Sequence, residues 1–246
     1  MALFNEERPH IFDTMVGQKV TVEGVRQHSI QNKFSSLYIL QGQFGSGKTT
    51  LARIIALASN CHHKDEHGNP CCECDNCRSI LANTAIDFVE IDGATYNKVE
   101  DMRKIIDGVS YAPSSLDYKV IIIDEAQMLS QAAWNASLKT FEEAPSYVIF
   151  ILATTDVNKI PSPVRSRAMT FNFKQISTDD MAQHLMMVAQ KHGKSIDQDG
   201  ARLISPLPIF NFLSVLSVYF HRITISLSRP CCFFVSTTEH CLVSFK

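Results

Sequence analysis

The sequence predicts an α/β fold in which helices flank a sheet of parallel strands. Several short apolar runs end in a small or polar residue, as buried strands do, and they are SLYILQG from Ser36, DFVEID from Asp87, KVIIID from Lys119 and YVIFILATT from Tyr147. Helical patterns lie between these runs, which is the alternation typical of an open parallel sheet. A chain of 246 residues is long enough for one large domain, or for a medium domain and a small one.

Apolar periodicity and end signals predict the helices. The first is TTLARIIALASN from Thr49, and the second is AAWNASLKTFEE from Ala132. After the polar segment QISTDD, the run DMAQHLMMVAQKHG has a Ser/Thr/Asp start and stops at Gly193. A short helix is expected from Asp197, so a small second domain begins at this polar segment.

Composition is that of an ordinary globular protein, with 45% hydrophobic and 20% charged residues and a net charge of -2. The charge gives no global basic surface, so any nucleic-acid contact has to come from a local patch. Charged residues near the start stand where a signal peptide has its apolar core, so no secretory signal is predicted. The longest apolar part of the C-terminal tail is interrupted by His221 and Arg222, which argues against a membrane span. We therefore expect a cytoplasmic protein without a membrane span.

A phosphate-binding loop follows the first predicted strand and opens the first predicted helix. The motif G-x-x-x-x-G-K-[ST] is satisfied by Gly42, Gln43, Phe44, Gly45, Ser46, Gly47, Lys48 and Thr49. Glycines let backbone N–H groups curl around phosphate oxygens at a helix N-terminus. Lys48 is expected to reach the β- and γ-phosphates, and the Thr49 hydroxyl to bind Mg²⁺. The alternative, a glycine-rich turn that matches by chance, does not account for the strand and helix on either side.

Polar residues end two later strands. Asp124 is the last residue of KVIIID and is suited to hold Mg²⁺, while the adjacent Glu125 is suited to polarise an attacking water. The alternative is a pair of acids that only caps a strand end. Thr154 and Thr155 end the next strand, where a hydroxyl is able to sense the γ-phosphate.

The stretch CHHKDEHGNPCCECDNCR, from Cys61, follows the first helix. Cys71, Cys74 and Cys77 have C-x2-C-x2-C spacing, and together with Cys61 they predict a closed tetrahedral Zn²⁺ site with a structural role. In a reducing compartment such clusters bind metal more often than they form disulfides. Cys72 and the histidines at 62, 63 and 67 are alternative ligands. An iron–sulfur cluster and a redox pair are the competing interpretations.

These motifs in combination resemble the gamma/tau family of bacterial DNA polymerase III, the ATPases of the clamp loader and members of the AAA+ superfamily. The resemblance runs from about Arg8 to about Ile204. The matching stretches are RPHIFDTMVGQ from Arg8, GQFGSGKTT from Gly42, PCCECDNC from Pro70, EIDGATYNKVEDMRKI from Glu90, YAPSSLDYKVIIIDEAQMLS from Tyr111, NASLKTFEEAP from Asn135 and FILATTDVNKIPSPVRSR from Phe150.

The resemblance implies roles for individual residues. ATP and Mg²⁺ would be bound by the loop from Gly42 to Thr50, Asp124 and Glu125 would serve the metal and the water, and Thr155 would sense the γ-phosphate. Arg167 matches an arginine that reaches into a neighbouring subunit's ATP site. The implied adenine-pocket residues are Arg8, Pro9, Val16 and Gly17, and the implied zinc ligands are Cys61, Cys71, Cys74 and Cys77.

The resemblance also implies a domain organisation and partners. Residues 1–175 would form an AAA+ nucleotide-binding domain with a zinc module at 61–77, and 176–205 a partial helical lid. Residues 206–246 match neither the family's lid motif G-S-x-R-D-A nor its collar, and they resemble an unrelated or out-of-frame continuation. The expected partners are clamp-loader subunits of the delta and delta-prime types, the sliding clamp and primed DNA, with ring assembly impaired by the missing collar.

Two functional interpretations remain open from the sequence. One is a clamp-loading ATPase, and the other is a nucleotide- and zinc-binding assembly module with little or no turnover, which the missing lid motif favours. Among enzymes, a different AAA+ motor would not be expected to carry the cysteine insertion. Delta-prime subunits commonly have a degraded phosphate loop, whereas GQFGSGKT is intact.

Overall fold

The computed structural model describes residues 7–204, 224–225 and 235–236, and the chain divides into two compact units. The larger unit is Pro9–Gln175, and the smaller one combines residues up to Arg8 with those from Ile176 onward. The domain bounds proposed from the sequence stay a prediction. Among the described residues, no helix has both the length and the apolar character needed to cross a membrane.

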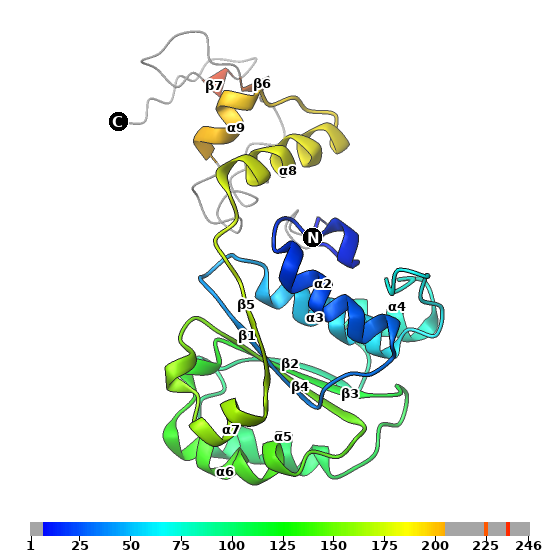
Figure 1. Ribbon diagram of the computed structural model, residues 1–246, viewed down its shortest axis with the longest axis vertical. Coiled ribbons are helices and arrows are strands. Elements are labelled where there is room, and N and C mark those ends of the chain that lie inside the picture. Colours follow the sequence, from blue (N-terminus) through cyan, green and yellow to red (C-terminus); the bar gives the residue numbers. More distant parts are fainter. Residues whose placement is uncertain (1–6, 205–223, 226–234, 237–246) are drawn as a thin grey trace. The chain divides into compact units, whose positions relative to one another are not determined.

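Five parallel strands form the sheet of the larger unit, in the order β2-β3-β4-β1-β5 (Figure 1). Their bounds are β1 Leu37–Gln41, β2 Phe88–Asp92, β3 Lys119–Asp124, β4 Val148–Thr154 and β5 Met169–Asn172. The predicted α/β class and all four predicted strands are confirmed. The fifth strand was not predicted, because it lies at the sheet edge with mostly exposed side chains and so lacks a buried apolar run.

Helices cover both faces of this sheet (Figure 1). One face carries α2 Lys19–Ile30, α3 Lys48–Asn60 and α4 Asp75–Leu81, and the other carries α5 Val99–Val109, α6 Gln131–Glu142 and α7 Ser162–Arg167. Short 3-10 turns are η1 Phe12–Thr14, η2 Ala126–Met128 and η3 Val157–Lys159. The predictions of α3 and α6 are confirmed, whereas α2, α4, α5 and α7 were not predicted.

The core has two layers because side chains alternate along each strand. On β1, Tyr38 and Leu40 pack with α3, while Leu37 and Ile39 pack with the helices of the opposite face. Trp134, on α6, is 2% exposed and anchors that second layer. Strands buried on both faces explain why the sequence shows continuous apolar runs.

The smaller unit contains α8 Thr178–Lys191 and α9 Gln198–Ile204, both of which were predicted. The Ser177 side chain accepts the Asp180 backbone N–H at the start of α8, and Gly193 adopts a φ of 69° just after its end. Two short antiparallel strands, β6 Thr224–Ile225 and β7 Val235–Ser236, also belong to this unit. The remainder of the predicted tail, 206–246, lies outside the described residues.

A buried carboxylate fixes the loop that enters β3. Asp87 is 2% exposed, and its Oδ2 accepts the backbone N–H groups of Ser114 at 2.9 Å, Ser115 at 2.8 Å and Leu116 at 3.3 Å. Burial raises the pKa of Asp87, but these hydrogen bonds outweigh it and hold the pKa below the ordinary value of 3.8. The ionised carboxylate therefore stabilises the fold.

We expect Asp87→Asn to lower the free energy of unfolding by about 2 kcal/mol near neutral pH, because a neutral amide oxygen accepts these hydrogen bonds more weakly than a carboxylate does. A depressed pKa contributes stability above the unfolded value, and this contribution is lost as the pH falls through the folded value. Urea unfolding from about pH 7 to about pH 2 should show the difference between wild type and variant shrinking in acid. A difference that stays constant over this range would contradict the assignment.

Candidate functional site

The predicted phosphate loop lies between β1 and α3. Gly45 and Gly47 have φ angles of +75° and +97°, which favour glycine, and Gly47 directly precedes the first turn of α3. The Ser46 hydroxyl donates to the Gln43 carbonyl at 2.8 Å and holds the loop closed on itself. Backbone N–H groups at the N-terminus of a long buried helix are thus available to an anion.

Lys48 is a buried cation in this loop. It is 4% exposed, and its Nζ donates to the Gly42 carbonyl at 3.0 Å and to the Gln43 carbonyl at 2.9 Å. Burial lowers the pKa of Lys48, and the carboxylates of Glu125 and Asp124 partly oppose that shift. The loop therefore concentrates positive charge next to two acids.

Thr49, in the first turn of α3, contacts Asp124 at the end of β3. The Thr49 hydroxyl donates to Asp124 Oδ2 at 2.6 Å, and Asp124 Oδ1 accepts the Glu125 backbone N–H at 2.9 Å. The strand β4 lies between β1 and β3, and the Gly42 N–H donates to the Thr154 carbonyl at 3.1 Å. A hydroxyl and a carboxylate so placed are the oxygen ligands that Mg²⁺ prefers, so this pair fits the predicted magnesium site.

A glutamine that was not predicted connects Glu125 with the end of β4. Gln127 donates through Nε2 to Glu125 Oε2, and its Oε1 accepts the Thr154 hydroxyl at 2.7 Å and the Thr155 N–H at 3.2 Å. Thr154 is fully buried and its hydroxyl is used in this network, whereas the Thr155 side chain is exposed. Thr155, which is exposed, is the residue that the resemblance implies as the γ-phosphate sensor. The sequence signal for Gln127 is weak, since one amide after an Asp-Glu pair is unremarkable.

The N-terminal segment also reaches the phosphate loop. The Met15 Cε lies 3.2 Å from where a Cβ on Gly47 would stand, and Gln18 Nε2 donates to the Ser46 carbonyl at 3.5 Å. Of the predicted adenine-pocket residues, Pro9, Val16 and Gly17 are half-buried in the larger unit, and Arg8 belongs to the smaller one. The remaining predicted loop residues Gln43 and Phe44 are exposed, and Thr50 is half-buried on α3.

Arg167 ends α7 with an exposed side chain, and its Nη1 donates to the Glu142 carbonyl at 3.1 Å. An exposed guanidinium is accessible to a second molecule, which a role in a neighbouring subunit's site requires. The predicted roles of Arg167 and of the other site residues stay predictions.

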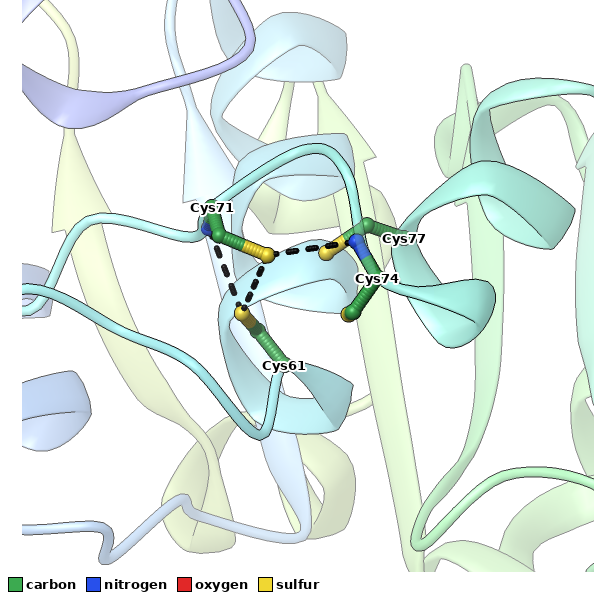
Figure 2. Close-up of side chains that lie close together, drawn as sticks. All are labelled: Cys61, Cys71, Cys74 and Cys77. Atoms are coloured by element: carbon green, nitrogen blue, oxygen red, sulfur yellow. Dashed lines mark hydrogen bonds between the residues drawn. The ribbon is translucent and has the colours of Figure 1, made fainter.

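Four cysteines converge at the end of α3 (Figure 2). Cys61 follows α3, Cys71 and Cys74 lie in the loop, Cys77 is on α4, and all four sulfur atoms lie within 4.8 Å of one another. The Cys61 and Cys71 sulfurs are 3.5 Å apart, and the thiols are free. Four thiolates around one tetrahedral Zn²⁺ would be about 3.8 Å apart, so the donor set and its spacing fit the predicted metal.

The alternative ligands point elsewhere. Cys72 has a φ of 60°, and its sulfur lies 3.8 Å from the His10 carbonyl; burial and the neighbouring thiols raise its pKa to about 11. Cys71, by contrast, is one of the four predicted ligands. Burial raises the pKa of its thiol, but hydrogen bonds from the backbone N–H groups of Glu73 and Cys74 outweigh burial and lower that pKa to about 7. His62 pairs with Asp117 at 2.7 Å, and the other two histidines of the loop are exposed. The cluster therefore comprises the four predicted cysteines.

Comparison with known proteins identifies the family. A family model described as DNA polymerase III, delta subunit, matches residues 17–177, more than half of this chain. Relatives include DNA polymerase III subunit gamma of Buchnera aphidicola subsp. Schizaphis graminum, 38% identical over 222 residues, and subunit tau of Bacillus subtilis, 40% identical over 206 residues. The chain belongs to the DNA polymerase III gamma/tau family.

This gamma/tau chain spans only part of those relatives. The alignments cover 89% of the chain and 60% of the Buchnera protein, and 83% of the chain and 36% of the Bacillus protein. Thermotoga maritima RuvB, described as a Holliday junction branch migration motor, superposes with a TM-score of 0.59 at 22% identity, over 86% of this chain and 64% of RuvB. At that identity the likeness shows the fold, which is that of the AAA+ P-loop ATPases, as predicted.

Substitution of Gly42 tests the packing of the phosphate loop in this gamma/tau chain. A Cβ on Gly42 would lie 2.6 Å from the Phe173 Cβ and 2.8 Å from the Phe173 carbonyl oxygen, so the backbone would have to shift. We expect Gly42→Ala to lower the free energy of unfolding by about 1–3 kcal/mol in urea titrations. Gly108, in α5, has no atom within 4 Å of such a Cβ, and Gly108→Ala should be neutral or stabilising. Equal stability of Gly42→Ala and wild type would contradict this geometry.

Proposed function

We propose that this chain is an ATP-binding and ATP-hydrolysing clamp-loader subunit that, with partner subunits, places a sliding clamp on primed DNA. The observation that carries the proposal is the contact between Thr49 of the phosphate loop and Asp124 of β3, in a chain whose relatives are DNA polymerase III gamma and tau subunits. The loop alone would bind an anion, whereas the loop beside two acids has the groups that phosphoryl transfer to water requires.

Each side chain has a distinct task in this proposal. The Lys48 ammonium counters charge on the β- and γ-phosphates, Thr49 and Asp124 hold Mg²⁺, and Glu125 orients the attacking water. The bound Mg²⁺ supplies further neutralisation of phosphate charge. Because Gln127 holds both Glu125 and the end of β4, it would keep the base in register with the Thr155 sensor.

Hydrolysis by this chain depends on Lys48 if the proposal holds. We expect Lys48→Ala to lower the rate of Mg²⁺-dependent ATP hydrolysis by at least about 100-fold, equivalent to about 2.7 kcal/mol in the barrier. Phosphate release should be measured alone and with delta- and delta-prime-type subunits, clamp and primed DNA, which should accelerate only the wild type. Lys33→Ala, at an exposed lysine outside the site, is the matched control. Equal rates in wild type and Lys48→Ala would remove the proposal.

Assembly would couple hydrolysis between subunits. We propose that Arg167 reaches the ATP site of a neighbouring subunit, where a guanidinium stabilises charge on the transferring phosphoryl group. The exposure of Arg167 at the end of α7 supports this role. A cytoplasmic location belongs to the same proposal, since the clamp and the primed DNA are found there.

A second candidate is a nucleotide- and zinc-binding assembly module with little or no turnover. The sequence after Ile204 favours it, because no G-S-x-R-D-A motif occurs there. Equilibrium nucleotide binding together with single-turnover hydrolysis separates the two candidates: retained binding without chemistry supports this one.

We also propose that the four cysteines hold a structural Zn²⁺. Cys74→Ser should abolish metal binding, whereas Cys72→Ser, at a neighbour whose sulfur lies outside the cluster, should retain about one Zn²⁺ per chain. Elemental analysis of the purified proteins measures this. Because closed zinc sites contribute to folding, a strong chelator should also lower the melting temperature of wild type and of Cys72→Ser. Iron with visible cluster absorbance would instead identify an iron–sulfur centre.

A further inference from the structure

Asn69 lies in the loop between α3 and α4, residues 61–74, which we call the cysteine loop, and it contacts the N-terminal segment, residues 12–18, far away in sequence. Its side chain is 4% exposed; Oδ1 accepts the Phe12 N–H at 3.0 Å, and Nδ2 donates to Asp13 Oδ2 at 2.7 Å and to Asp65 Oδ2 at 2.8 Å. Both amide hydrogens and the amide oxygen are therefore used, so the side chain has one orientation. Asn69 lies two residues before Cys71, a member of the four-cysteine cluster.

Further contacts hold each of these two segments against α2. The Asp13 carboxylate also accepts from Arg26 Nη2 at 2.6 Å, and the Ser29 hydroxyl donates to the Gly68 carbonyl at 2.6 Å. Gly68 has a φ of +76°, and a Cβ there would lie 2.9 Å from Ile30, so the loop packs closely on α2. Phe12 is 2% exposed and belongs to the core layer that contains α3. The contact is thus well packed.

The N-terminal segment continues from this contact to the phosphate loop. Three residues after Phe12, Met15 packs on Gly47, and Gln18 bonds to the Ser46 carbonyl. Gln18 is fixed in turn by Lys174, whose backbone N–H donates to Gln18 Oε1 at 3.0 Å. Residues 12–18 therefore join the cysteine loop at one end to the phosphate loop at the other.

We propose that the cysteine loop positions the N-terminal segment against the phosphate loop, with Asn69 as the positioning residue, so that metal binding by the four cysteines strengthens binding of adenine nucleotides. The inference rests on the proposed ATP and zinc sites. Segment 12–18 carries Val16 and Gly17, which are expected at the base rather than at the phosphates. Binding of the nucleoside part should therefore depend on this contact more than binding of the phosphates, which the phosphate loop itself provides.

The test compares two ligands on the full chain. Asn69→Ala should weaken binding of Mg-ATP about tenfold in calorimetry, a change of about 1.4 kcal/mol. Binding of inorganic tripolyphosphate should change less than about twofold, and kcat at saturating ATP should be retained while KM rises. Asn97→Ala, at an exposed asparagine whose amide bonds only locally to the Ala94 carbonyl, is the matched control.

A second variant and metal removal keep the test decisive. Asp13→Ala removes one of the two N-terminal partners of Asn69 and leaves Asn69 and its bond to the Phe12 N–H in place. It should therefore show the ATP defect with the metal content unchanged, even if Asn69→Ala folds poorly. Removal of the proposed zinc ion with a chelator should weaken ATP binding by the wild type. The same treatment should cause little further loss in Asp13→Ala, because metal removal and the substitution act through the same contact.

Three outcomes distinguish the proposals. Equal ATP affinity in wild type, Asn69→Ala and Asp13→Ala overturns the inference and leaves the proposed function intact. Equal losses for ATP and tripolyphosphate also overturn it, since the effect would then be general damage to the loop. If wild type binds neither ligand, the proposed function fails together with the inference.

Discussion

A hydrogen bond of 2.6 Å joins the Thr49 hydroxyl, in the first turn of α3, to the Asp124 carboxylate, at the end of β3. It forms because β1 and β3 are both parallel to β4, which lies between them, so their carboxyl ends reach the same edge of the sheet. Lys48 needs that arrangement as well: burying its ammonium would be costly without two backbone carbonyls and the nearby acids. The sheet register thus determines the electrostatics of the site.

The helix α3 links this site to the cysteine cluster. It begins with Lys48 and ends at Asn60, directly before Cys61, and its residues from Ile54 to Asn60 are all buried. A straight helix of 13 residues is about 20 Å long, so the two sites are separate but rigidly connected. The segment 12–18 runs between the same two sites by a different route. The cysteine cluster and the phosphate loop are therefore joined through backbone as well as through side chains.

Much of the fold could be predicted because strands buried on both faces leave continuous apolar runs, as in KVIIID and YVIFILATT. β5 could not, because an edge strand with exposed side chains resembles a loop in sequence. Lys48, Thr49, Asp124 and the four cysteines were predicted from local spacing, and the structure brings each group together. Gln127 and Asn69 were missed, because their importance lies in partners distant in sequence or in the geometry of neighbouring strands.

The amino-acid sequence by itself determined the four buried strands, the helices α3, α6, α8 and α9, the phosphate loop and the ligand spacing, because each depends on residues within a few positions of one another. Only the tertiary structure decided which threonine at the end of β4 is exposed, which of the five cysteines between residues 61 and 77 has its sulfur outside the cluster, and what the loop before Cys71 touches. These are pairings between segments more than about fifty residues apart or choices of side-chain direction. Burial and hydrogen-bond satisfaction settle them after the chain has packed.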